Sequence, residues 1–219
     1  MQLIVLGLNH RTAPVDIREK FSFDKTEVTA ALNHVYEHEQ VAECVLLSTC
    51  NRTELYAVLD DVAEPKAFML DLLRHLRGVE DVAVEDRWFF AYEGEAMLHH
   101  LFSVAAGLDS LVIGEGQILS QLKVAYIAAY SRGLTGPVFN IIFQRAISVG
   151  KKVRTVTGIA NKPVSVSYAA VNLAEDCLQK PMADAKVLIL GAGEMSELTA
   201  THLQSKGVKS IFVSNRTFY

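Results

Sequence analysis

The spacing of apolar and polar residues divides the first 60 positions into three strands and one helix. Short apolar runs predict strands at residues 3–8, 44–47 and 55–59, the last of which alternates around Tyr56 and Val58. Residues 25–39 instead carry apolar side chains at helical spacing. Asp24 precedes them as an N-cap, and Glu27 completes an approximate capping box. The chain therefore opens as strand, helix, strand, strand.

Helical spacing dominates the middle of the chain. It predicts helices at residues 65–76, 93–107, 118–132, 137–155 and 166–179. One further strand is expected at 88–92, and Gly133 to Gly136 form a turn between two of the helices. Strands and helices that mix in this way predict an α+β domain.

A different pattern begins at Lys186. Residues 186–190 form a fully apolar strand, a helix runs from a glycine-rich turn through Leu203, and residues 210–214 form a second strand. This is the first β-α-β unit of a Rossmann-type fold, so we assign the chain to the α/β class. Gly, Asn and Pro residues mark a boundary near 158–163, which gives an α+β catalytic domain at 1–157 and a nucleotide domain at 158–219. Because a Rossmann domain needs several more strands, we expect the second domain to be incomplete in a truncated chain.

Composition narrows the class of protein. The 219 residues are 50% hydrophobic and 21% charged, which is typical of a globular protein. A net charge of -4 argues against non-specific binding of nucleic acid by bulk charge. No apolar run approaches the length of a membrane span and no signal peptide is present, so we expect a cytoplasmic protein with no membrane contact. The three cysteines contain no CxxC pair, which predicts neither a disulfide framework nor a metal site.

The glycine-rich turn predicts a dinucleotide site. Gly191-x-Gly193-x-x-Ser196 follows a buried strand and opens a helix, where absent side chains and free amides suit a pyrophosphate. The simpler alternative is a tight turn between strand and helix. The second strand ends in Ser-Asn-Arg216 in place of an acidic residue, which favours NADP because Arg216 can pair with the 2′-phosphate. A surface arginine is the alternative there.

Cys50 is the cysteine with the most polar neighbours. It follows an apolar strand in the segment Ser-Thr49-Cys50-Asn51-Arg52-Thr-Glu, and a guanidinium close by can lower the pKa of a thiol. A cysteine at a strand end is more often a small buried hydrophobe, and Cys44 and Cys177 keep that interpretation. Cys50 is therefore a candidate nucleophile.

Two polar segments and a histidine pair are candidate binding elements. Residues 7–14 and 107–121 are richer in polar groups and glycine than a structural element requires. The second segment offers Glu115, Gln117 and Gln121 as donors and acceptors, although a helix-capping loop would explain it as well. On the preceding helix, one of His99 and His100 should face inward, as a proton carrier or as a packing residue.

Taken together, four motifs resemble the glutamyl-tRNA reductase family in order and spacing. They are GLNHRTAP, STCNRTE, GLDSLVIGEGQILSQ and GAGEMSELTA followed by SNRT, and they cover essentially the whole chain. The resemblance implies reduction of glutamyl-tRNA(Glu) to glutamate-1-semialdehyde with NADPH, the first step of five-carbon-route tetrapyrrole synthesis. It also implies a thioester on Cys50, a homodimer of the full-length protein and an aminomutase that takes the product.

The resemblance also implies roles for individual residues. His100, seven residues before the GLD motif, would polarise the carbonyl or protonate the leaving oxygen beside Cys50. The family's glutamate pocket corresponds to Thr49, Asn51, Arg52, Ser110, Glu115, Gly116, Gln117 and Gln121. Its nucleotide loop corresponds to Gly191, Ala192, Gly193, Glu194, Met195 and Ser196. Because the nucleotide domain should be incomplete, we expect this chain to cleave the ester while reducing it poorly.

Two other functions fit part of the sequence. A semialdehyde or shikimate-type NADP dehydrogenase would explain the nucleotide turn but not the polar neighbours of Cys50. A tRNA-binding module would use the basic residues of one helix, which are Arg145, Lys151, Lys152 and Arg154. A solvated helix face explains that cluster more simply.

Overall fold

The computed structural model describes residues 1–79, 85–159, 166–178 and 180–216. The chain divides into two compact units, Met1–Ile159 and Ala160–Tyr219. Each unit has its own hydrophobic core. Within the described residues no helix is long and apolar enough to cross a bilayer.

A four-stranded antiparallel sheet forms the centre of the first unit. Its strands are β1 (Gln2–Asn9), β2 (Val41–Ser48), β3 (Arg52–Leu59) and β4 (Phe90–Glu93), in the order β2-β3-β1-β4. All eight residues of β3 are buried. The alternation around Tyr56 and Val58 therefore does not mark an exposed face, because helices cover both faces of the sheet.

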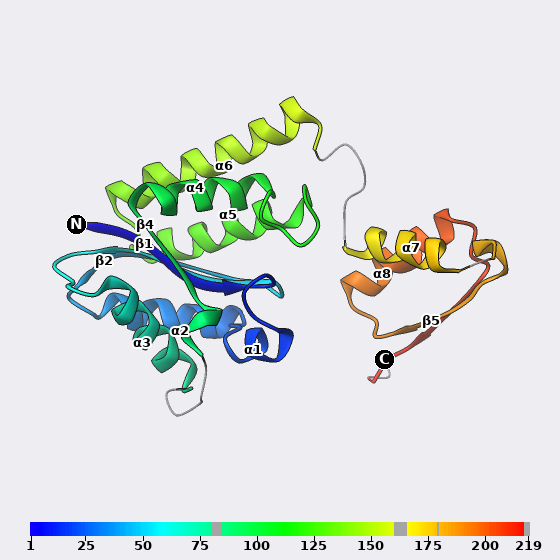
Figure 1. Cartoon of the computed structure of the whole chain (residues 1–219), viewed down its shortest axis with the longest axis horizontal. Coiled ribbons are helices and arrows are strands. Elements are labelled where there is room, and N and C mark those ends of the chain that lie inside the picture. Colours follow the sequence, from blue (N-terminus) through cyan, green and yellow to red (C-terminus); the bar gives the residue numbers. More distant parts are fainter. Residues whose placement is uncertain (80–84, 160–165, 179, 217–219) are drawn as a thin grey trace. The chain divides into compact units, whose positions relative to one another are not determined.

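Six helices make the two covering layers. One layer contains α1 (Val15–Lys20), α2 (Lys25–Tyr36) and α3 (Pro65–Arg77), and the other contains α4 (Gly94–Ala106), α5 (Gln117–Tyr130) and α6 (Pro137–Thr157). Figure 1 shows these groups on opposite sides of the strands. Three layers around one core fit the predicted α+β architecture.

Local sequence explains most element boundaries, with two corrections. Asp24 caps α2 through the amides of Thr26 and Glu27, and the Glu27 side chain returns to the Asp24 amide, so the predicted capping box is confirmed. The six-residue helix α1 was not predicted, because it is too short to show a helical period. The strand expected from Trp88 begins only at Phe90, since Asp86–Trp88 form a 3-10 turn.

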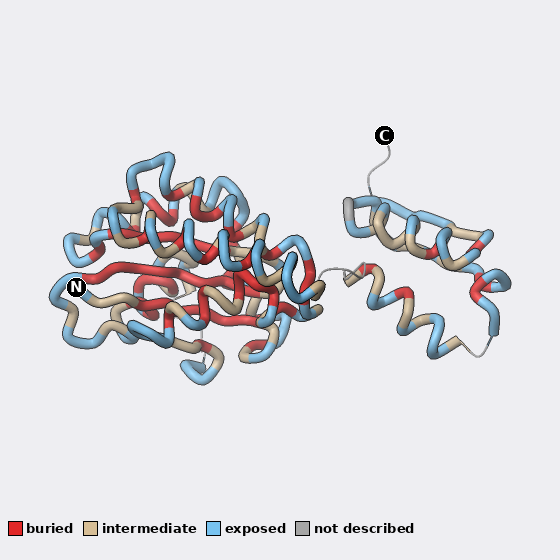
Figure 2. Tube along the Cα trace, turned by 90° about the horizontal axis from the view of Figure 1, so that it is seen from above, coloured by how far each residue is buried: buried red, intermediate tan, exposed pale blue. Residues whose placement is uncertain are grey.

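The second unit is built around a parallel pair of strands. Its elements are α7 (Val166–Cys177), a 3-10 turn (Met182–Asp184), β5 (Lys186–Leu190), α8 (Glu194–Ser205) and β6 (Ser210–Ser214). β5 and β6 pair in parallel, as the predicted β-α-β unit requires. Its main core cluster contains Val171, Met182, Leu203 and Val208. Figure 2 shows the contrast in burial between this unit and the sheet of the first.

Candidate active site

Cys50 lies at the tip of the hairpin that joins β2 to β3. The Thr49 amide donates to the Arg52 carbonyl over 2.8 Å, which leaves Cys50 and Asn51 as the two central loop residues. The Thr49 hydroxyl accepts from the Asn51 and Arg52 amides at 3.2 and 3.1 Å. Thr49 therefore holds the turn in shape, and the turn presents Cys50 as an exposed thiol.

The end of β1 lies beside this hairpin. Asn9 is in register with Arg52, and the His10 amide donates to the Asn51 carbonyl over 3.0 Å. From α1, the Arg18 guanidinium donates to the Cys50 carbonyl at 2.5 Å and to Asn51 Oδ1 at 3.3 Å. The polar segment 7–14 and the hairpin segment 48–54 thus meet at one end of the sheet, and Arg18 of α1 binds the backbone of Cys50.

Below the turn, a buried cluster of polar side chains is organised by Glu54. Its carboxylate accepts hydrogen bonds from Arg52 Nη1 at 2.6 Å and from the Tyr56 hydroxyl at 2.6 Å. His100 Nε2 lies 3.0 Å from the same Glu54 oxygen that Arg52 binds. His99, by contrast, is exposed on α4, so His100 is the inward-facing member of the pair.

Electrostatics fix the protonation of this cluster. Burial alone would raise the pKa of Glu54, but Arg52 and His100 outweigh it and lower the pKa to about 2. The carboxylate is therefore ionised and acts only as an acceptor. His100 therefore donates from Nε2 to this carboxylate.

Asp109 closes the cluster from the segment after α4. Its carboxylate lies 3.0 Å from Arg52 Nη2 and 3.0 Å from Arg11 Nη1, and its carbonyl accepts from Arg52 at 2.5 Å. The neighbouring Ser110 is buried, and its hydroxyl has no hydrogen-bond partner in the described structure. An unsatisfied buried hydroxyl at this position is available to a ligand.

Three groups of this cluster have the composition of a metal site. Possible ligand atoms of Glu54, His100 and Asp109 lie within 4.8 Å of one another. The Arg52 guanidinium, however, pairs with both carboxylates. A metal ion would have to compete with that charge, so the cluster functions as an ion-pair network.

A hollow of about 450 Å³ reaches this network from outside. His100 and Asp109 line it together with Arg11, and Leu108 and Tyr92 form apolar parts of its wall. Phe90 and Tyr92 pack beside the His100 ring at centroid distances of 5.0 and 5.1 Å. The volume is sufficient for an amino-acid side chain and part of its ester.

The remaining pocket candidates lie further along the 107–121 segment. Glu115 is buried, Gly116 and Gln117 are exposed at the start of α5, and Gln121 follows one turn later. Arg154 of α6 binds the carbonyls of Gly114 and Glu115. Arg154 thus supports this loop and is not part of a free basic surface, in contrast to the exposed Arg145, Lys151 and Lys152.

The other two cysteines differ sharply from Cys50. Cys44 is completely buried in β2, and burial raises the pKa of its thiol to about 12. Cys177 was expected to be a small buried residue, and this expectation was wrong, because Cys177 is exposed at the end of α7 in the second unit. Cys50 differs from it in its polar neighbours at the β2–β3 turn, which are Thr49, Asn51 and Arg18.

The glycine-rich turn has the backbone that a phosphate site needs. Gly191 adopts a φ of +115° and donates to the Ser214 carbonyl over 2.7 Å, and α8 begins directly after Gly193. No atom lies within 4 Å of the position that a Gly193 side chain would occupy. Arg216 is exposed after β6. These residues fit a nucleotide with its pyrophosphate at the helix N-terminus.

Sequence reasoning missed three residues that the structure brings to the site. Glu54 and Asp109 stand inside the quoted motifs but were given no role, and Arg18 lies on the unpredicted helix α1. A charged residue directly before the apolar run at residues 55–59 of the same strand is the signal that could have identified Glu54. Arg18 has no such signal, because its role depends on where a short helix packs.

Comparison with known proteins identifies relatives for both units. The family described as "Glutamyl-tRNAGlu reductase, N-terminal domain" matches residues 6–157, and the one described as "Shikimate / quinate 5-dehydrogenase" matches residues 172–219. The dehydrogenase family, which corresponds to the alternative function, thus matches residues of the second unit.

Individual relatives match over the whole chain. Glutamyl-tRNA reductase of Pelotomaculum thermopropionicum is 45% identical over 100% of this chain and 49% of its own length, and that of Alkalilimnicola ehrlichii is 47% identical over 99% and 48%. The solved structure of glutamyl-tRNA reductase from Methanopyrus kandleri aligns with a TM-score of 0.66 at 36% identity, covering 99% of this chain and 50% of that one. The chain therefore spans about half the length of the curated relatives it matches.

Proposed function

The chain belongs to the glutamyl-tRNA reductase family, and on that premise we propose that it binds glutamyl-tRNA(Glu) and forms a thioester between Cys50 and the glutamyl group. The observation that carries the proposal is the exposed thiol at the tip of the β2–β3 hairpin, where the next strand contributes Arg52 and Glu54 to a buried network with His100. The complete reaction would be NADPH-dependent reduction to glutamate-1-semialdehyde, as the first step of tetrapyrrole synthesis.

In the first step, the Cys50 thiolate attacks the ester carbonyl that joins glutamate to tRNA. The carbon–oxygen bond to the tRNA ribose breaks, and the ribose oxygen takes up a proton. His100 would supply that proton from Nδ1, because its Nε2 is hydrogen-bonded to Glu54. Splitting the reaction in this way leaves a thioester, which accepts hydride more readily than an oxygen ester.

Recognition of the glutamyl group depends on Arg52 and Asp109. The Arg52 guanidinium is almost wholly buried and already bound by Asp109, so the substrate carboxylate must displace the Asp109 carboxylate. Once displaced, the Asp109 carboxylate can form an ion pair with the α-ammonium group of the substrate. Ser110 offers its unsatisfied hydroxyl in the same place. This exchange of one ion pair for two would select an amino acid with an acidic side chain.

NADPH would be held by the second unit. The Gly191 to Ser196 turn and the amides that open α8 suit the pyrophosphate, and Arg216 suits the 2′-phosphate. Bound there, NADPH would supply the hydride for reduction of the thioester to the aldehyde, with release of the Cys50 thiolate. Ala192 and Met195 are exposed at the turn, where they would contact the bound cofactor.

The test is mass spectrometry of the intact protein after mixing with glutamyl-tRNA. We expect a glutamyl adduct on Cys50 and free tRNA in equal amounts. Cys50→Ser should abolish the adduct, whereas Cys177→Ser, which removes the other exposed thiol, should leave it unchanged.

One further substrate sharpens this test. Glutaminyl-tRNA presents an amide in place of the carboxylate and should react at least about 100-fold more slowly, because Arg52 would lose its charged partner. An adduct on Cys177, or tRNA release that survives Cys50→Ser in folded protein, would contradict the proposal.

A further inference from the structure

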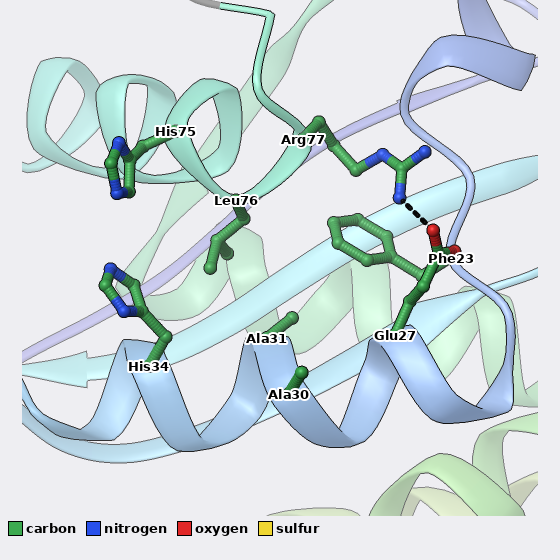
Figure 3. A pocket seen from close by; sticks show the side chains of 8 residues that line it. All are labelled: Phe23, Glu27, Ala30, Ala31, His34, His75, Leu76 and Arg77. Carbon is green, nitrogen blue, oxygen red and sulfur yellow. Dashed lines mark hydrogen bonds and ion pairs between the residues drawn. The ribbon is translucent and has the colours of Figure 1, made fainter.

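Three of the seven histidines gather on the outer face of the first unit, away from the candidate active site. His34 lies on α2, His38 lies in the turn just after α2, and His75 lies on α3. Figure 3 shows His34 and His75 projecting toward one another from the two helices. The two helices cover the same face of the sheet. The proposed reaction uses none of these three histidines.

Two helices and the turn after one of them bring the potential ligands together. Asp71 and His75 are four residues apart on α3 and share one face of that helix, whereas His34 lies in the last turn of α2 and His38 lies two residues beyond its end. All four line one hollow of about 480 Å³, together with Phe68 and Leu72. Three imidazoles and one carboxylate are a ligand set typical of zinc.

The distances from the His34 ring to the other two rings suit a shared ion. The His34 centroid is 5.2 Å from that of His75 and 5.6 Å from that of His38. A tetrahedral ion with nitrogen ligands at about 2.0–2.1 Å holds its imidazole centroids roughly 5 Å apart. Among the described residues, the Glu54 cluster is the one group with three possible ligand atoms within 4.8 Å of one another. The histidine nitrogens lie further apart than that, so the rings must rotate about χ2 before they can bind one ion. That torsion is broad in histidine.

The surroundings favour a cation. The Glu37 carboxylate lies 3.8 Å from His34 Nδ1, where it can orient the ring from behind and leave Nε2 toward the hollow. The two arginines of α3 near this hollow are paired with carboxylates, Arg74 with Asp86 at 2.8 Å and Arg77 with Glu27 at 2.9 Å, the second marked by the dashed line in Figure 3. The site is open to solvent, so an ion can enter without a change in fold.

We propose that His34, His38 and His75, with Asp71 or water as a fourth ligand, form a binding site for Zn²⁺ or a similar divalent transition-metal ion. Binding joins α2 to α3 across the face of the sheet. Its consequence is stabilisation of the first unit by a link separate from the active site, because an ion that binds only the folded state shifts the unfolding equilibrium.

The experiment is isothermal titration of untagged protein with Zn²⁺. Every sample carries Cys50→Ser and Cys177→Ser, so that exposed thiols do not bind the metal. We expect one ion per chain and a higher melting temperature with zinc. His34→Gln should weaken binding by at least about tenfold, since even the loss of a residue that only orients a ligand costs that much. His75→Gln should act likewise.

The matched control is His99→Gln, an exposed histidine on α4 that should leave zinc affinity unchanged. Circular dichroism without metal checks that each variant is folded. With Cu²⁺ as the probe, electron paramagnetic resonance should report coupling to several imidazole nitrogens, fewer in His38→Gln. Absence of binding at about a 100-fold excess of zinc would overturn the proposal. So would unchanged affinity in folded His34→Gln His75→Gln.

Discussion

The two units differ most in what their strands bury. In the first unit every residue of β3 is buried, from Arg52 through Leu59. In the second unit no residue of β5 or β6 is buried, and Leu188, Leu190 and Phe212 are 60%, 78% and 58% exposed. The candidate thiol chemistry thus rests on a sheet with a complete core, whereas the candidate nucleotide turn rests on strands with little packing.

The first unit is also distinguished by its buried charged side chains. The first unit buries Arg52, Glu54 and Glu43, each with a partner. Glu43 caps α6 by accepting from the Val138 and Phe139 amides at 3.0 and 2.7 Å. Buried charges of this kind persist only where the surrounding structure is fixed. A rigid frame is what a nucleophile and its histidine need in order to keep their geometry.

Hydrogen exchange should show the largest difference between the units. We expect amides of β3 at Leu55 to Val58 to exchange at least about 1000-fold more slowly than those of β6, which corresponds to about 4 kcal/mol in opening free energy. The reason is that β3 opens only when the core unfolds, whereas β6 is exposed. Exchange measured by mass spectrometry on the whole chain tests this directly.

If the amides of β6 are protected from exchange as strongly as those of β3, the expected difference in stability between the two units is wrong. Helix α8 gives an internal reference, because Leu203 belongs to the small core while Met195 is exposed. Amides near Leu203 should exchange at rates between those of β6 and β3.

Acid should weaken the first unit through Glu54. Its pKa in the folded state is about 2, below the ordinary 4.5, so its stabilising contribution is present above about pH 4.5 and is lost as pH falls toward 2. The full contribution is about 3 kcal/mol for a shift of this size. Glu54→Gln should lower the free energy of unfolding at pH 7 by a similar amount and remove this part of the acid dependence.

Urea unfolding followed by tryptophan fluorescence measures the effect, because the single tryptophan, Trp88, lies in the first unit. Glu27→Gln is the matched control. Its carboxylate also pairs with an arginine, Arg77, but at the surface, where solvent screens the pair. Equal effects of the two substitutions would show that burial does not set the strength of the Glu54 network.

Sequence patterns predicted the helices and strands well where the spacing of apolar residues repeats along the chain. The helices at α2 through α8 and the strands β5 and β6 follow from periodicity and from the glycine-rich turn, and Asp24 gave the start of α2. The order of strands in the sheet was not predictable, because alternation does not say which strands pair. β1 lies between β3 and β4, although β2 and β3 separate it from β4 along the chain.

The candidate site shows the same limit. Cys50, Arg52 and His100 were identified by type and motif, and the structure brings Arg52 and His100 onto one carboxylate, that of Glu54. That Arg52 is already bound by Asp109 could not be predicted, since the two are 57 positions apart in sequence. Contacts over such distances depend on tertiary packing, which no local pattern encodes.

Two glycines give the smallest but most closely matched comparison of the units. A side chain at Gly150 on α6 would lie 2.5 Å from the Ala105 carbonyl oxygen of α4, whereas one at Gly193 would meet nothing within 4 Å. Gly150→Ala gains about 1 kcal/mol of helix propensity but must push two packed helices apart, at a cost of up to about 3 kcal/mol. We expect a net loss of about 2 kcal/mol, measured by Trp88 fluorescence in urea.

Gly193→Ala should change little in the fold, because the residue has an extended backbone with a φ of -85° at the N-cap of α8. Alanine is a weaker N-cap than glycine, so we expect a loss of about 0.5 kcal/mol, seen as faster hydrogen exchange in α8 alone. The added methyl group does enter the space proposed for the pyrophosphate. A variant that keeps its exchange pattern but loses NADPH binding would therefore separate the role of this turn in binding from its role in folding. Weak stability of the second unit would then be compatible with a working nucleotide turn.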